Sequence, residues 1–132
     1  MRIDCDIHPA IAGTATLLPY LSDHWREMSI VRGIDDLQTI NYPDPTPLAC
    51  RADWRPARGR PGLDVETIGR QALDPFGTDI GILNPLYGIQ TLFSDDLAAA
   101  YASALNDHIR ATFLDRDPRL RAAIVVSLEN IE

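Results

Sequence analysis

Hydrophobic and polar positions alternate at the start of the chain. In the stretch MRIDCDIHP, isoleucine and cysteine occupy one set of alternate positions, while aspartate and histidine occupy the other. A period of two is typical of a β-strand, because successive side chains point to opposite faces. We therefore predict a strand over residues 3–8 that ends before Pro9. Its two faces would carry Ile3, Cys5 and Ile7 on one side and Asp4, Asp6 and His8 on the other.

Two later segments have apolar positions at helical spacing. Residues 64–77 begin at Asp64 and stop at a proline and a glycine, and residues 94–118 begin at Ser94 and stop at Pro118. Aspartate and serine favour the N-cap of a helix, and the apolar stripes indicate packed faces. We predict a helix over each segment, with Ser94 as the cap of the longer one. A shorter apolar segment over residues 17–25 is helical or irregular.

Two more strands are predicted between and after these helices. Residues 78–88 begin with small and β-branched side chains and run into a proline–glycine turn, and residues 122–126 are continuously apolar. A continuous apolar run is typical of a strand buried on both faces of a parallel sheet. The order strand, helix, strand, helix, strand predicts an α/β fold with a parallel sheet, right-handed crossovers and helices that cover the sheet.

Residues 31–63 differ from the rest of the chain because they are rich in proline and arginine and follow no regular period. We predict a long loop here, which is either an ordered functional loop or a variable insertion. Guanidinium groups bind carboxylates through paired hydrogen bonds, so the loop arginines could recognise an acidic substrate. Solvated surface charges are the favoured alternative. These arginines are Arg51, Arg55, Arg58 and Arg60.

Composition and charge exclude several classes of protein. The chain has 132 residues, which indicates one domain or part of one, and its net charge of −7 gives little electrostatic support for binding nucleic acid or an anionic membrane. No apolar run approaches the roughly 18 residues that span a bilayer, and the first residues do not form a signal peptide. Cys5 and Cys50 are too far apart for a short metal-binding motif, and we expect Cys5 to be a buried free thiol. A cytoplasmic location is the default expectation.

The polar face of the first strand carries the clearest candidate chemistry. Asp6 and His8 are two positions apart, so their side chains would lie on one face and could converge on one cation. A carboxylate and an imidazole suit zinc, manganese or iron. An ordinary surface or core pair is the alternative. The other two histidines, His24 and His108, are expected to have packing or surface roles.

Asn84 and Tyr87 follow the second predicted strand directly. The carboxyl ends of parallel strands form the functional edge of many α/β proteins, so both residues could contact a substrate. The alternative is that the NPLYG segment only turns the chain and that Tyr87 packs over the rim of the sheet.

Three segments together resemble the amidohydrolase-related family, in its aminocarboxymuconate-semialdehyde decarboxylase-like branch. They are DCDIHP, LDPFGTDIGILNPLYG and LNDHIRATFLDRDPRLRAAIVVSLEN. The resemblance implies a partial (β/α)8 TIM barrel, in which residues 1–132 form the N-terminal part of one barrel domain with about its first three strands. It also implies one divalent metal ion at the mouth of the barrel, zinc first and manganese as the alternative, with Asp6 and His8 as the ligand pair of the first strand.

The function implied by this resemblance is that of a metal-dependent hydrolase or non-oxidative decarboxylase. Its substrate would be a small carboxylated or cyclic organic molecule, and the intact enzyme would be a homo-oligomer. The family's remaining ligands, a histidine and an aspartate on later strands, have no match in residues 9–132. We therefore expect an inactive N-terminal portion of an enzyme and assign no catalytic residue. A non-catalytic α/β interaction module is the alternative function.

Overall fold

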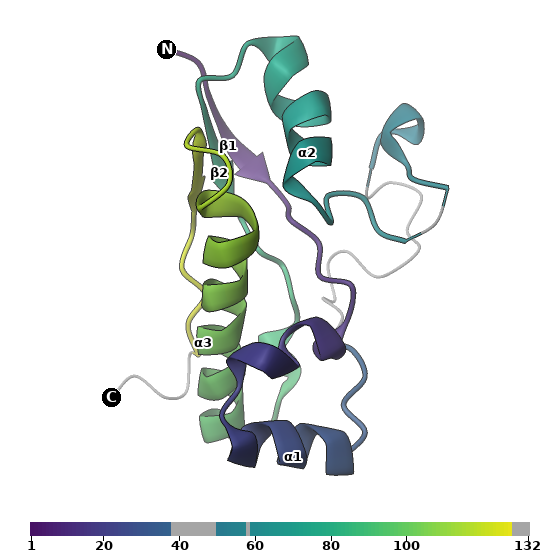
Figure 1. Ribbon diagram of the computed structural model, residues 1–132, viewed down its shortest axis with the longest axis vertical. Coiled ribbons are helices and arrows are strands. Elements are labelled where there is room, and N and C mark those ends of the chain that lie inside the picture. Colours follow the sequence, from purple (N-terminus) through teal and green to yellow (C-terminus); the bar gives the residue numbers. More distant parts are fainter. Residues whose placement is uncertain (38–49, 58, 128–132) are drawn as a thin grey trace.

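The three strands form one parallel sheet. The computed structural model describes residues 1–37, 50–57 and 59–127. Strands β1 (Ile3–Ile7), β2 (Ile80–Leu83) and β3 (Leu120–Ala122) lie side by side in the order β1-β2-β3, and both neighbouring pairs are parallel (Figure 1). The predicted α/β class and parallel sheet are confirmed. Such a sheet is compatible with part of a larger α/β fold.

The first predicted helix is confirmed at both of its ends. Helix α2 (Val65–Ile68) begins after Asp64, whose carboxylate accepts a hydrogen bond from the Thr67 backbone N–H at 2.7 Å. A π-helical turn and a 3₁₀ turn extend the segment as far as Gly77. Gly77 has a φ of 58°, a left-handed conformation that favours glycine and ends the helix.

Helix α3 (Asp95–Ile109) is the long helix that the sequence predicts, and a π-helical turn extends it to Leu114. Ser94 stands at the predicted N-cap position, but its side chain makes no capping hydrogen bond. Asp95 and Asp96 still place negative charge at the positive end of the helix dipole.

The short apolar segment is helical. Two 3₁₀ turns (Thr14–Thr16 and Leu18–Tyr20) lead into helix α1 (Asp23–Val31), which lies at the opposite end of the molecule from α2 (Figure 1). Among the described residues, none of the helices is both long and apolar enough to cross a membrane.

One face of the sheet is packed closely against the helical segments. A Cβ atom on Gly81 of β2 would lie 2.8 Å from Ile7 Cδ1 and 2.9 Å from Leu73 Cδ2, so only glycine fits there without a shift of its neighbours. The hydrophobic core continues from this contact along α3. Its largest fully buried apolar side chains are Tyr101, Phe113, Leu17, Leu73, Leu83, Ile89, Leu97, Leu105, Ile109 and Leu120.

Two predictions of burial are wrong. The strand predicted over residues 122–126 ends at Ala122, and the side chains of Ile124 and Val126 are exposed. An apolar strand is buried on both faces only where other elements cover both faces, and the described residues cover only the side of Val125, which packs against the core. The backbone N–H and C=O of Val125 bond to the side chain of Asn106. Cys5 is likewise exposed and is not a buried thiol.

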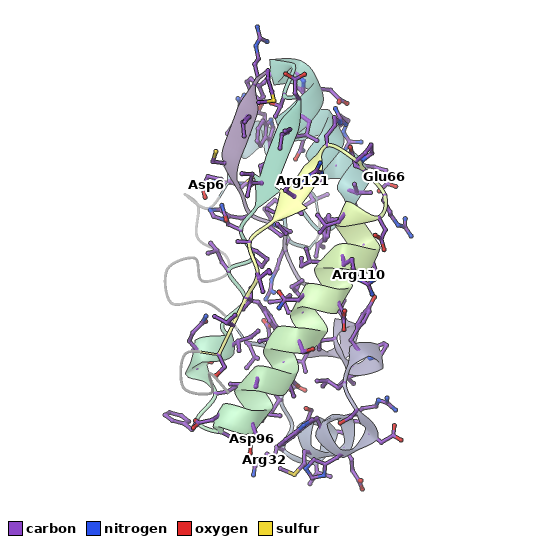
Figure 2. All side chains as sticks on the ribbon, turned by 90° about the vertical axis from the view of Figure 1, so that its left-hand side faces the viewer. Asp6, Arg32, Glu66, Asp96, Arg110 and Arg121 are labelled. Carbon is purple, nitrogen blue, oxygen red and sulfur yellow. The ribbon has the colours of Figure 1, made fainter. Side chains whose placement is uncertain are left out.

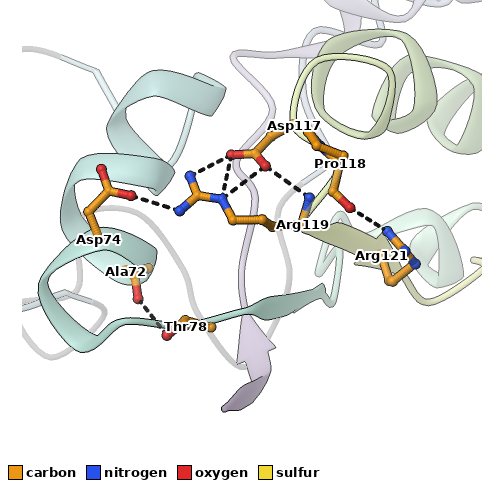
Figure 3. Close-up of polar contacts among 7 residues, drawn as sticks. All are labelled: Ala72, Asp74, Thr78, Asp117, Pro118, Arg119 and Arg121. Atoms are coloured by element: carbon orange, nitrogen blue, oxygen red, sulfur yellow. Dashed lines mark hydrogen bonds and ion pairs between the residues drawn. The ribbon is translucent and has the colours of Figure 1, made fainter. Parts of the chain in front are cut away.

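Ion pairs join the α2 segment to the third strand. Arg119 donates from Nη2 to Asp117 at 2.7 Å and from Nη1 to Asp74 at 2.8 Å (Figure 3). The hydrogen bonds from Arg119 hold the pKa of Asp117 below its ordinary value, and both carboxylates raise the pKa of Arg119. This cluster fixes the turn before β3 relative to the end of the helical segment before β2.

The described arginines of the long loop make internal contacts. Arg60 is ion-paired with Asp36 and donates to the carbonyl of Ile11. Burial alone would raise the pKa of Asp36, but the hydrogen bond and charge of Arg60 outweigh it and lower that pKa. Arg51 is paired with Asp53. The contacts of Arg60 are with other groups of the protein. They match neither of the two expectations for the loop arginines, which were substrate recognition and a solvated surface charge. Arg58 and residues 38–49 lie outside the described residues.

Candidate metal centre

The first strand contains an irregularity at its carboxyl half. Ile3 pairs with Ile80 and Asp4 with Gly81, but the next partners are Ile7 and Leu83. Three steps along β1 thus correspond to two along β2, which is a β-bulge. Because of the extra residue, Ile3 and Ile7 have different environments, with exposed fractions of 47% and 8%. The prediction that Ile3, Cys5 and Ile7 all lie on one face is wrong.

Asp4 stabilises this bulge. Its Oδ1 accepts a hydrogen bond from the backbone N–H of Asp6 at 3.0 Å. The register places Asp4 with Gly81 and Ile7 with Leu83, and these two partners lie on the same face of β2. Asp4 therefore belongs to the face of Ile7, and the expected polar row of three residues is reduced to two.

Asp6 and His8 converge at the carboxyl end of β1. Asp6 Oδ1 lies 3.4 Å from His8 Nε2, and the exposed fractions of the two side chains are 75% and 33%. Figure 2 shows Asp6 at the outer edge of the sheet, on its first strand. The structure thus brings together the two residues that the sequence suggests as metal ligands.

The hydrogen bonds of His8 define which ring nitrogen faces Asp6. His8 Nδ1 is 3.0 Å from the main-chain oxygen of Asn84. A carbonyl oxygen only accepts, so Nδ1 carries the proton and donates it. In the neutral ring, Nε2 then presents its lone pair toward Asp6. A proton on Nε2, a water molecule or a metal ion would bridge these two acceptors. A backbone carbonyl that fixes the distal nitrogen is typical of metal-binding histidines.

The separation of the two donors fits a tetrahedral ion. Zinc bonds of about 2.0–2.2 Å at the tetrahedral angle place two ligand atoms about 3.3–3.6 Å apart. The observed 3.4 Å between Asp6 Oδ1 and His8 Nε2 falls in this range. A catalytic zinc site needs three protein ligands and one open position. Within residues 1–37, 50–57 and 59–127, no group of three histidine, cysteine or acidic side chains could hold a metal ion. Asp6 and His8 alone are one protein ligand short of such a site.

Asn84 contacts the pair from the end of β2. Its Nδ2 donates to the Cys5 carbonyl at 2.7 Å and to Asp6 Oδ1 at 3.2 Å, and its backbone N–H donates to the Ile7 carbonyl at 2.7 Å. The sequence predicts substrate contact for Asn84, and the structure places its amide against the carboxylate of Asp6.

Tyr87 lies elsewhere, within the core. Its hydroxyl is 3.2 Å from Thr14 Oγ1 and accepts a hydrogen bond from the backbone N–H of Leu37 at 3.2 Å. Burial raises the pKa of Tyr87 to about 12. This arrangement favours the packing alternative over substrate contact. His24 and His108 also pack against aromatic rings, as expected, and His108 is buried.

Gly62 is a neighbour of the site that the sequence does not reveal. Its φ is +77°, and a Cβ atom there would lie 2.9 Å from the carbonyl oxygen of His8. The backbone N–H of Ala10 donates to the Gly62 carbonyl at 2.9 Å. The Pro61–Gly62 pair indicates a turn, but no local signal shows that this turn lies on the chain that follows β1.

Comparisons with known proteins do not assign the chain to a family. No family model matches the sequence. A search of curated proteins finds no match either.

Proposed function

We propose that Asp6 and His8 are two ligands of a divalent metal centre in a metal-dependent hydrolase or non-oxidative decarboxylase of the amidohydrolase-related kind. The observation that carries the proposal is the 3.4 Å separation of Asp6 Oδ1 and His8 Nε2, with His8 Nδ1 held by a carbonyl. The tetrahedral spacing favours zinc over manganese, which prefers octahedral oxygen sites.

The described residues would hold and orient the ion. His8 offers the lone pair of Nε2, Asp6 offers a carboxylate oxygen, and the Asn84 carbonyl fixes the imidazole ring. When bound, a divalent ion supplies Lewis-acid chemistry, which serves both hydrolysis and loss of a carboxylate. The high exposure of Asp6 leaves the site open to a small carboxylated or cyclic substrate.

Catalysis in this proposal requires ligands outside the described residues. Two donors leave a tetrahedral ion with two further positions, of which one must be a protein ligand and the other open to water or substrate. The partial (β/α)8 barrel and the homo-oligomeric state belong to the same proposal, and the parallel order β1-β2-β3 supports the barrel.

A zinc titration tests the proposal. We expect the chain to bind one zinc ion weakly, because it supplies only two of the ligands, and Asp6→Ala and His8→Ala to weaken binding at least tenfold each, since loss of a supporting residue alone costs about 10–100-fold. His24→Ala is the matched control, because it removes an exposed histidine next to an aspartate without touching the site. Calorimetry gives the affinities. Unchanged zinc affinity in His8→Ala would remove the assignment.

A non-catalytic interaction module remains the second candidate function. The exposed side chains of Ile124 and Val126 beside β3 favour it, because an exposed apolar segment next to a strand is suited to contact with another chain. Absence of zinc binding together with self-association in sedimentation would support this candidate over the enzyme.

A further inference from the structure

Asn84 is bonded to both members of the candidate metal pair, although it lies on a different strand. Its side-chain Nδ2 reaches Asp6 Oδ1 at 3.2 Å, and its main-chain oxygen lies 3.0 Å from His8 Nδ1. The same Nδ2 also donates to the carbonyl of Cys5 at 2.7 Å. One residue at the end of β2 therefore holds a carboxylate and an imidazole that are both on or next to β1.

The amide group of Asn84 has no donor left for a substrate. An asparagine side chain has two N–H bonds, and here they are directed to the Cys5 carbonyl and the Asp6 carboxylate. We infer that Asn84 is a positioning residue, which orients Asp6 and His8 for the metal, and not a substrate-binding donor. This inference rests on the proposed metal site and adds a supporting residue to it.

Asp6 needs such support because of where it lies. Its side chain is 75% exposed and follows the bulge in β1, a strand paired on only one side by the described residues. A carboxylate in that position has several accessible rotamers, and water competes for its oxygens. The bond from Asn84 selects the rotamer in which Oδ1 faces His8 Nε2. Metal-binding carboxylates are commonly held by hydrogen bonds of this kind.

The test compares two asparagine variants. Asn84→Ala should weaken zinc binding by about 10–100-fold. Asn106→Ala is the matched control, because the Asn106 side chain lies on α3 and also bonds to backbone, but at Val125 and not at β1. Asn106→Ala should lower stability and leave zinc affinity unchanged. Asn84→Gln, which keeps both amide donors on a longer side chain, should fall between wild type and Asn84→Ala.

A second readout needs no metal. In the zinc-free protein, a nuclear Overhauser effect between the His8 ring and the Asp6 β-protons reports their contact, and we expect it to be lost in Asn84→Ala and kept in Asn106→Ala. Retention of this signal in Asn84→Ala, or equal loss of zinc affinity in both variants, would overturn the inference. Failure of the wild-type chain to bind zinc at His8 would instead refute the proposed function, and the metal-free signal would still decide the role of Asn84.

Discussion

At the scale of single residues, the Tyr87 hydroxyl is a buried polar group that bonds to two others. It lies 3.2 Å from both Thr14 Oγ1 and the backbone N–H of Leu37. Tyr87→Phe keeps the ring and removes both bonds, while the Leu37 N–H keeps a second acceptor in Asp36 Oδ1 at 3.0 Å. We expect it to lower the free energy of unfolding by about 0.5–1.5 kcal/mol. Urea denaturation measures the change.

Tyr20→Phe is the control for this prediction. Tyr20 is exposed, and its ring packs edge-on against His108, a contact that phenylalanine preserves. Its loss of stability should be small. Equal stability of Tyr87→Phe and wild type would show that the hydroxyl does not matter to the fold, and the substrate-contact alternative for Tyr87 would regain support.

His108 gives the fold a dependence on pH. Burial lowers its pKa below the ordinary value of 6.5. Between the folded and unfolded pKa values the unfolded chain therefore binds more protons, and stability falls as pH falls through this window. We expect His108→Gln to reduce the loss of stability between about pH 7.5 and pH 5.5. Urea midpoints at the two pH values measure it, with His24→Gln as the control. An unchanged pH dependence in His108→Gln would contradict the account.

At the scale of elements, substitution of two glycines by alanine is expected to change the stability of the fold in opposite directions. Gly81→Ala places a Cβ atom within 3 Å of Ile7 and Leu73 and should cost about 1–3 kcal/mol by overpacking. Gly69 has helical dihedrals, and its Cβ atom would meet only Arg119 Nη2 at 3.6 Å. Gly69→Ala should therefore stabilise the fold by about 0.5–1 kcal/mol. Thermal unfolding of both variants is the measurement, and equal effects of the two would contradict this packing.

The sequence correctly predicts those features of the helices that depend on interactions between residues close together in the chain. The Asp64 cap, the stop at Gly77 and the apolar face of α3 are local signals, and the structure confirms all three. The bulge in β1 could not be predicted, because the alternation around Asp6 is unbroken in sequence and the register depends on pairing with β2. The exposure of Ile124 also depends on tertiary cover, which the sequence of a short apolar run does not specify.

At the scale of the whole molecule, the candidate site forms where three segments meet. Asp6 and His8 come from β1 and its end, Asn84 from the end of β2, and Gly62 from the long loop. The spacing of Asp6 and His8 is a local property of one strand, so the sequence could predict their convergence. The roles of Asn84 and Gly62 arise from parallel pairing and loop packing. Residue type and position alone therefore could not distinguish Asn84 from Tyr87, which lies nearby in the chain but within the core.

The most direct test of the central claim is a long-range ¹H–¹⁵N spectrum of the imidazole rings during addition of zinc. The chain has three histidines, so each ring can be followed separately. We predict that His8 carries its proton at Nδ1 before zinc is added, and that zinc then shifts the Nε2 resonance of His8 much more than its Nδ1 resonance. A larger shift at His8 Nδ1 than at Nε2, or equal shifts in all three rings, would contradict the account.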